Sequence, residues 1–458
     1  MAKTNISDIE HKRMTETPIA RLVVALSIPT VISMLMTSIY NMADTYFVSS
    51  LGDSPVGAVG IVFSLQSIIQ AVGFGLSMGC GSLVSIKLGE KKNSEANKFL
   101  STAFFTAFIC GAIIMGACFI DLDALLLFFG STKTILPYAR GYATVILIAA
   151  PFMCSLYVIN NSLRSQGKAT FSMIANLVGG MLNIILDPIF IFTLDMGVVG
   201  AAIATAISQL VSFAISLSFY FGKRSILLLS PRFISRCPYD YWLIIKTGAP
   251  TVFRQGLGSV STTLLNIQVK PFGDAAIAAV SLANKVYMIV RSIVLGIGQG
   301  FQPVAGYNYG ARKNRRVKEA FRVAVILGST VACIGAALVA IFPTEVMELF
   351  RDEGTQTVEI GARMLRYLAL CLPFLGYSSY VNMMYQSLGF VKGATFLASC
   401  RQGVFFIPLI YLLPYLFGLE GIIMTQSAAD ILTFLISIPF HIIFVKKFLK
   451  DNENSQGL

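Results

Sequence analysis

The chain has 458 residues, of which 55% are hydrophobic and only 13% are charged, and its mean hydropathy is +0.73. Soluble domains carry about 25% charged residues, so the composition excludes an ordinary soluble protein and predicts a polytopic membrane protein. The formal net charge of +12 would suggest a nucleic-acid partner in a soluble protein. Here the basic residues lie in short loops between apolar segments, where the positive-inside rule explains them. We therefore expect a lipid bilayer as a partner and no nucleic acid.

Apolar segments long enough to cross a bilayer follow one another along the whole chain. A spanning helix needs about 20 predominantly apolar residues. Such segments lie near 22–47, 56–86, 99–120, 135–160, 169–194, 197–221, 243–269, 275–305, 320–343, 360–388, 393–416 and 420–445. The sequence therefore predicts an all-α polytopic membrane protein with twelve transmembrane helices.

The charges of the predicted loops alternate from one side to the other. One set of loops is basic, as at Lys91-Lys92 and at Arg312-Lys313, and the other set holds mostly acidic residues such as Asp53 and Asp274. Because Lys and Arg gather on the cytoplasmic side, this alternation predicts a multi-pass protein of the cell (plasma or inner) membrane with both termini in the cytoplasm.

The second half of the chain repeats the first. The residues that recur 221 positions later are Pro29, Gly52, Asp53, Ala58, Val59, Gly75, Gly79, Gly89 and Asn93, as Pro250, Gly273, Asp274, Ala279, Val280, Gly296, Gly300, Gly310 and Asn314. Six helices per repeat give both halves one orientation, which predicts two parallel six-helix lobes around a central cleft. We place the N-terminal lobe at 1–222, a cytoplasmic linker at 223–241 and the C-terminal lobe at 242–458. The glycines of Gly73-x-Gly75 and Gly296-x-Gly298 fall inside spanning segments, so we interpret them as sites of close helix packing.

Polar side chains inside the first half indicate a cation site. Asn183 and Asp187 are four residues apart, so on a helix they share one face, and Pro188 follows directly. A carboxylate near the middle of a membrane helix costs roughly 2.5–3.5 kcal/mol on insertion scales, so it normally faces a cavity or a partner. Pro188 can free a backbone carbonyl on the same face.

Further oxygen-bearing residues lie at the same depth. Asp44 is nine residues before Asp53, Asp187 is eight before Asp195, and Thr205 is eight after Gly197, which places all three roughly 12 Å below one end of their helices. Asn183 and Tyr40 lie one turn deeper. Carboxylate, amide and hydroxyl oxygens suit Na⁺, or a proton shared by two carboxylates. The structural alternative is that Asp44 merely ends its helix and Thr205 bonds its own backbone.

The second half does not copy this set. By the repeat offset Asp44 falls on Leu265 and Thr205 on Gln426. The second half carries other charged residues within or near its helices, namely Arg254, Lys285, Arg291, Arg401 and Asp430. These side chains either snorkel, form pairs such as Asp430 with Arg401 or Arg254, or tune the cleft, and the sequence leaves their role open.

Across nearly its whole length the chain resembles the multidrug and toxic compound extrusion (MATE) family, closest to its DinF-like and MepA-like bacterial branch. The resemblance rests on Pro29, Tyr40-Asn41-Met42-Ala43-Asp44-Thr45, Gly52-Asp53, Gln166-Gly167, Asn183-x-x-x-Asp187-Pro188 and the repeat. It implies that Asp44, Asn183, Asp187 and Thr205 bind the coupling cation, with Tyr40 and Asn160 in the first-lobe cavity and Pro29 as a bend in the first helix. The NorM branch has acidic cation ligands in its second lobe; equivalents are lacking here, which favours coupling through the first lobe.

These observations predict a secondary active transporter that exports amphiphilic, often cationic, drugs in exchange for H⁺ or Na⁺ by alternating access. We expect no cofactor, no metal other than Na⁺ at the cation site, and a monomer. The main alternative is a lipid-linked-oligosaccharide flippase of the same broad superfamily; a channel is also compatible with the composition. An enzyme is disfavoured because no paired nucleophile and base and no set of metal ligands is present. The same oxygens serve H⁺ and Na⁺, so the sequence leaves that choice open, and it leaves the physiological substrate open too.

Overall fold

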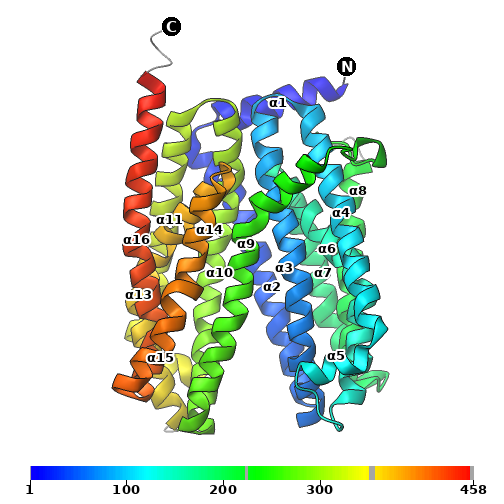
Figure 1. The fold of residues 1–458 in the computed structure, drawn as a ribbon, viewed down its shortest axis with the longest axis vertical. Coiled ribbons are helices and arrows are strands. Elements are labelled where there is room, and N and C mark those ends of the chain that lie inside the picture. The colour runs from blue at the N-terminus through cyan, green and yellow to red at the C-terminus, as the bar shows by residue number, and fades with distance from the viewer. Residues whose placement is uncertain (1, 222–224, 350–355, 454–458) are drawn as a thin grey trace. The chain divides into compact units, whose positions relative to one another are not determined.

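The computed structural model describes residues 2–221, 225–349 and 356–453, and every regular element in these ranges is helical. The long helical segments match the twelve predicted spans (Figure 1). They are α2 (Ile19–Ser49), α3 (Asp53–Gly89), α4 (Asn93–Ile120), α6 (Leu136–Ser165), α7 (Ala169–Pro188) with the π-helical η1 (Ile189–Thr193), α8 (Gly197–Phe221), α9 (Pro238–Val269), α10 (Asp274–Gly310), α11 (Asn314–Ile341), α13 (Gln356–Ser387), α14 (Val391–Ser399) with the π-helical η4 (Cys400–Phe405) and α15 (Phe406–Phe417), and α16 (Leu419–Glu453). The short helices α1 (Ala2–Glu16), α5 (Leu122–Phe128) and α12 (Pro343–Glu348) were not predicted.

Within the described residues, ten of these segments are both long and apolar enough to cross a membrane. The two that fall outside this set, α9 and α13, are each 32 residues long, which exceeds the roughly 20 residues that a span requires. Their hydropathy is lower because polar residues interrupt them, for example Gln255, Ser259 and Thr262 in α9. The twelve-helix prediction is confirmed.

The internal repeat is visible in the backbone. The helices α3 and α10 both have 37 residues, and α4 and α11 both have 28. The members of each pair begin at residues that the repeat relates. Gly52 and Gly273, which precede α3 and α10, have φ angles of 102° and 89°, a region open mainly to glycine. Lys91 and Arg312 both adopt the left-handed conformation, with φ angles of 60° and 58°. The two halves therefore share one backbone plan, irregular positions included.

The chain forms two compact units. Unit 1 comprises Met1–Thr17 and Ile32–Val252, and unit 2 comprises Pro18–Val31 and Phe253–Leu458. These units divide the chain inside α2 and α9. The linker at 223–241, whose first residues (223 and 224) lie outside the described residues, stays a prediction. Each division follows two residues after a proline of the repeat, Pro29 or Pro250. The first part of α2 belongs to unit 2 and its second part to unit 1, whereas the first part of α9 belongs to unit 1 and its second part to unit 2.

Glycines make this packing possible in unit 2. A Cβ atom on Gly296 or Gly300 of α10 would lie 2.6 Å from the Cα of Val31 or Ser27 of α2, which real Cβ atoms do not tolerate. The close approach also permits a hydrogen bond between the helices: the Thr30 hydroxyl of α2 donates to the Gly296 carbonyl of α10 at 2.6 Å. The glycines thus hold the first part of α2 against α10.

Unit 1 contains the equivalent contact. A Cβ atom on Gly79 of α3 would lie 3.0 Å from the Gly248 nitrogen of α9 and still closer to the Ile244 carbonyl. Gly75, the repeat partner of Gly296, faces Val252. The prediction that glycines of these segments serve close helix packing is confirmed.

The site in unit 1 is built around α6. This helix packs against α3, α4 and α8, and most of its side chains are buried. At the end of α6, the Gln166 side-chain oxygen accepts hydrogen bonds from the backbone nitrogens of Ile226 (3.0 Å) and Leu227 (3.3 Å). An ion pair of 2.8 Å between Lys98 and Asp240 holds the start of α9 on the same unit. In unit 2, α13 takes the corresponding central place and packs against α10, α11 and α16.

Candidate cation site

Asn183 joins the helices α7 and α8. Its side-chain nitrogen donates to the Asp187 carboxylate at 3.1 Å and to the Thr205 hydroxyl at 3.4 Å. All three side chains are buried, with exposed fractions of 2%, 0% and 7% for Asn183, Asp187 and Thr205. Since an amide nitrogen carries two hydrogens, Asn183 uses its whole donor capacity here. The structure therefore brings together three of the four residues predicted to bind a cation.

Small residues on α7 permit this geometry. A Cβ atom on Gly179 would lie 3.0 Å from the Ser208 carbonyl of α8, and one on Gly180 would lie 2.8 Å from Met36 and 3.3 Å from Tyr40 of α2. The α7 helix can therefore approach both α8 and the second part of α2. It ends at Pro188, after which the chain widens into the π-helical turn η1.

Three buried oxygens near this junction lack hydrogen-bond partners among the residues that the structure describes. They are Asp44 Oδ1, Asn183 Oδ1 and Asp187 Oδ2. The carboxylates of Asp44 and Asp187 lie close enough to interact electrostatically. A buried acceptor without a partner costs about 1–3 kcal/mol, and more when it is charged. Buried polar groups are normally paired, so three orphaned oxygens in one region indicate a place for a proton or a hard cation.

Two further residues at this site were not foreseen from the sequence. Tyr142 of α6 is buried, with an exposed fraction of 2%, and it interacts electrostatically with Asp44, Asp187 and Tyr40. Gln209 of α8 forms a side-chain hydrogen bond with Tyr40. The depth argument would have found Tyr142, because it lies six residues after the start of α6, roughly 9 Å along the helix.

A cavity of about 160 Å³ lies beside the junction, entirely within unit 1. Four of the predicted residues line it, namely Tyr40, Asn160, Asn183 and Thr205, whereas Asp44 and Asp187 do not. Asn183 therefore links the cavity to the Asp187 carboxylate behind it. Drug-sized ligands occupy pockets of roughly 300–1,000 Å³, and a water molecule takes about 30 Å³. In this conformation the cavity suits an ion with a few water molecules better than a drug.

The far side of the cavity is also polar. The Asn160 amide donates to Asn176 at 2.9 Å and accepts from the Ser216 hydroxyl at 2.8 Å. Arg164, which is 5% exposed, contributes to the lining, and its Nε has no hydrogen-bond partner within the described ranges. The sequence places Arg164 beside a basic loop, and its burial could be found only from the packing of α6.

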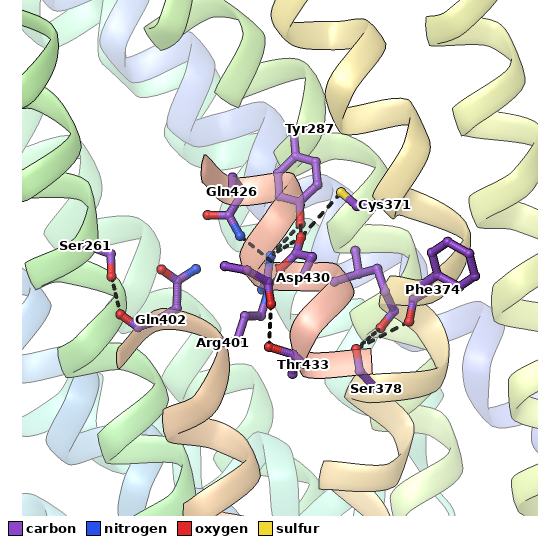
Figure 2. Close-up of polar contacts among 12 residues, drawn as sticks. Ser261, Tyr287, Cys371, Phe374, Ser378, Arg401, Gln402, Gln426, Asp430 and Thr433 are labelled. Atoms are coloured by element: carbon purple, nitrogen blue, oxygen red, sulfur yellow. Dashed lines mark hydrogen bonds and ion pairs between the residues drawn. The ribbon is translucent and has the colours of Figure 1, made fainter. Parts of the chain in front are cut away.

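A second polar cluster lies in unit 2 (Figure 2). Arg401 Nε and the Asp430 carboxylate form an ion pair of 2.6 Å. The Tyr287 hydroxyl donates to Asp430 at 2.7 Å, and the Gln426 amide donates to it at 3.0 Å. Of the two partners considered for Asp430, the structure selects Arg401. Lys285 has no hydrogen bond or ion pair within the described part of the chain.

Comparison with known proteins agrees with this architecture. The MatE family model matches residues 29–189 and 250–412, two ranges that begin at the repeat-related prolines Pro29 and Pro250. The chain is 28% identical to the multidrug export protein MepA of Staphylococcus saprophyticus, over 88% of this chain and 89% of that protein. It is 29% identical to the MepA protein of a Staphylococcus aureus strain, over 91% of this chain and 92% of that protein.

Solved structures give the same result. A MATE structure in complex with MaL6 matches with a TM-score of 0.91 and 26% identity, over 96% of this chain and 99% of that one. A MOP superfamily transporter from Pyrococcus furiosus, described as having a binding pocket of reverse polarity, matches with a TM-score of 0.89 and 26% identity, over 95% of this chain and 98% of that one. The family model covers more than half of the sequence, and the chain belongs to the MATE family.

Proposed function

We propose that this protein is a secondary active multidrug exporter in which inward movement of H⁺ or Na⁺ through unit 1 drives the export of amphiphilic, often cationic, drugs. The names of the MepA relatives support drug export, and membership of the MATE family supports a transporter. We further propose that it acts as a monomer in the cell membrane with both termini in the cytoplasm, as the loop charges indicate.

The observation that carries the proposal is the group of orphaned oxygens around Asn183. A bound cation would take Asp187 Oδ2 and Asn183 Oδ1, the two atoms without partners, while Asn183 keeps its bonds to Asp187 and Thr205. A proton on Asp187 would instead turn the carboxylate into a donor. Either event removes the cost of a buried unpaired acceptor.

Coupling requires that the ion bind one conformation of the protein more tightly than the other. Asp44 lies on α2, the helix that contributes to both compact units and contains Pro29. Proline removes one backbone hydrogen bond from the helix interior and so permits bending there. We propose that occupancy of the site biases the bend at Pro29, which links ion binding to alternating access.

Drug export, assayed as uptake into inverted membrane vesicles whose cytoplasmic face points outward, under an imposed pH gradient or an imposed Na⁺ gradient tests this proposal. Wild type would be compared with Asp187→Asn and Asp44→Asn, and with Asp195→Asn as a control at an exposed position. We expect one gradient to drive efflux in the wild type and the control, and neither to drive it in the two site variants. Equal efflux in all four proteins would refute the site in unit 1.

One observation favours the flippase alternative, namely the arginines of unit 2, since a basic region suits a lipid pyrophosphate. Transfer of a fluorescent lipid-pyrophosphate across proteoliposomes, without drug movement under either gradient, would replace the exporter by the flippase. Drug efflux without lipid transfer would exclude the flippase.

A further inference from the structure

Three arginines of unit 2 lie far from the ends of the membrane-spanning segments that carry them. Arg254 is near the middle of α9 (Pro238–Val269), and Arg291 is near the middle of α10 (Asp274–Gly310). At 1.5 Å per residue, both Cα atoms lie more than about 20 Å from either helix end. Arg401 lies on η4, between α14 and α15. Snorkelling to water, the usual solution for arginine in a membrane, is not available over such a distance.

Arg254 and Arg401 approach each other because α9 packs against η4. The Ser261 hydroxyl of α9 donates to the Gln402 carbonyl at 2.5 Å, and a Cβ atom on Gly403 would lie 2.9 Å from Leu257. Arg254 precedes Leu257 by three residues and Ser261 by seven, so it shares their helix face. Arg254 and Arg401 interact electrostatically. The carbonyl that accepts from Ser261 belongs to the π-helical turn η4, and such turns are frequent at functional sites.

Arg291 reaches the same place from α10. It follows Tyr287 by four residues and therefore lies on the face of α10 that bonds Asp430 and Arg401. It interacts electrostatically with Arg254, Arg401 and Asp430. Its Nε atom is buried and has no hydrogen-bond partner in the described part of the chain. Three helical elements thus direct three guanidinium groups toward one region.

The charges of this cluster do not balance. Asp430 pairs with Arg401, and its carboxylate also accepts hydrogen bonds from Tyr287, Gln426 and the Cys371 thiol. Arg254 and Arg291 have neither a hydrogen bond nor an ion pair among the described residues, so three positive charges face one negative charge. A guanidinium cannot lose its proton in a protein. Each unpaired arginine costs roughly 2.5–3.5 kcal/mol of insertion free energy at the centre of a membrane helix. Without a partner among the described residues, a purely structural role does not offset this cost.

We propose that Arg254 and Arg291, positioned beside the Arg401–Asp430 pair, bind the carboxylate or phosphate of an amphiphilic molecule. Arginine suits this task because its planar guanidinium forms paired hydrogen bonds with such groups. The transported molecules would then include zwitterionic and anionic amphiphiles in addition to cations. The inference rests on the proposed function only in treating the bound molecule as cargo; the binding itself requires neither a gradient nor the cation site.

Binding of two matched dyes to the purified protein tests the inference. Rhodamine 110 carries a free carboxylate, and rhodamine 123 is its methyl ester, so the pair differs at the group in question. We expect fluorescence polarisation to show about tenfold tighter binding of rhodamine 110 in the wild type, as one desolvated charge-assisted contact allows. Arg254→Gln and Arg291→Gln should each remove most of this preference and leave rhodamine 123 binding unchanged.

Lys285→Gln is the matched control, because it removes a basic residue of α10 that lies outside the cluster. A preference that is absent in the wild type, or that falls equally in the control and in the arginine variants, would overturn the inference. Since no ion gradient is applied, a failure here would leave the exporter proposal intact, and Asp187→Asn should keep the dye preference.

The source of the anion is separated by repeating the measurement in nanodiscs. Phosphatidylglycerol added to phosphatidylcholine discs should leave rhodamine 110 binding unchanged if the site takes the acidic group of a small molecule. Competition by phosphatidylglycerol that disappears in Arg254→Gln would assign the site to a lipid phosphate. Competition that persists in that variant, together with no dye preference, would refute the site.

Discussion

The two halves of this protein share a backbone plan but hold opposite charges inside it. The carboxylates of unit 1, Asp44 and Asp187, correspond by the repeat offset to Leu265 and Pro408. The arginines of unit 2 correspond in the same way to uncharged residues of the first half, Arg254 to Ser33, Arg291 to Gln70 and Arg401 to Gly180. The helix lengths and the irregular φ angles repeat, whereas the charged residues do not.

This difference shows how a duplicated scaffold can divide its work. Gly180 lets α7 lie against α2, whereas the corresponding stretch of the second half forms the π-helical turn η4, which carries Arg401. Thr205 accepts a hydrogen bond from Asn183, and its counterpart Gln426 donates one to Asp430. Small changes at equivalent positions would thus produce the proposed cation site in one unit and the proposed anion site in the other.

The largest expected effect concerns ion binding. In weakly buffered detergent solution, a substrate that competes with the coupling ion should release protons or Na⁺ from the wild type, as measured with an indicator dye. Asp187→Asn should release none, because the ligand with the orphaned oxygen is replaced by a neutral amide. The control Lys285→Gln should release as much as the wild type. Release from Asp187→Asn at the wild-type level would place the coupling site elsewhere.

The same substitution should act differently in unit 2. Asp430→Asn removes the partner of Arg401 and leaves three unbalanced guanidinium groups, which we expect to cost about 3–5 kcal/mol of the free energy of unfolding. Asp187→Asn removes no ion pair among the described residues, so it should change the free energy of unfolding by less than about 1 kcal/mol. Thermal unfolding of both variants in detergent checks the contrast. Equal stability of the two would contradict the assignment of Asp430 as the structural counter-charge of the cluster.

The symmetric glycine contacts permit a test of the shared plan. Gly79→Ala and Gly300→Ala each place a methyl group against backbone atoms of α9 and α2, and overpacking of this kind costs about 1–3 kcal/mol. The control is Gly116→Ala, since a Cβ atom there meets nothing within 4 Å and alanine favours the helix. Similar losses in thermal stability for Gly79→Ala and Gly300→Ala would support equivalent packing roles for the two repeat-related glycines. A loss in only one variant would contradict that equivalence.

The sequence was sufficient to predict the twelve helices and the repeat, because the apolar segments and the recurring glycines and prolines can be read directly from it. It also predicted the junction of Asn183, Asp187 and Thr205, since helix periodicity and depth determine which residues of neighbouring helices can meet. The division of α2 and α9 between the two units was not predicted. Pro29 and Pro250 indicate where these helices can bend, but the side on which each part packs follows from tertiary contacts such as those of Gly79 and Gly300.

Tertiary packing also explains what the site analysis left open. Arg164 lies at the end of α6 beside a basic loop, so the sequence alone did not show that it is buried and lines the cavity. Asp430 had two candidate partners of suitable charge, and the π-helical turn at η4, which the sequence did not predict, brings Arg401 rather than Arg254 within bonding distance. The charge sign of each unit was readable from the sequence, but the convergence of the arginines was not.

The smallest effect concerns Thr205, which marks the cavity side of the junction. Thr205→Val keeps the shape of the side chain but removes the oxygen that accepts from Asn183 and that the proposed cation would contact. We expect this change to cost about 1 kcal/mol, or roughly a fivefold loss of ion affinity. Thr205→Ser keeps the hydroxyl and should bind the ion as the wild type does. The dependence of drug efflux on ion concentration in vesicles measures this difference. If Thr205→Val matched Thr205→Ser, the hydroxyl would be a helix-packing group, and the cation site would consist of α2 and α7 alone.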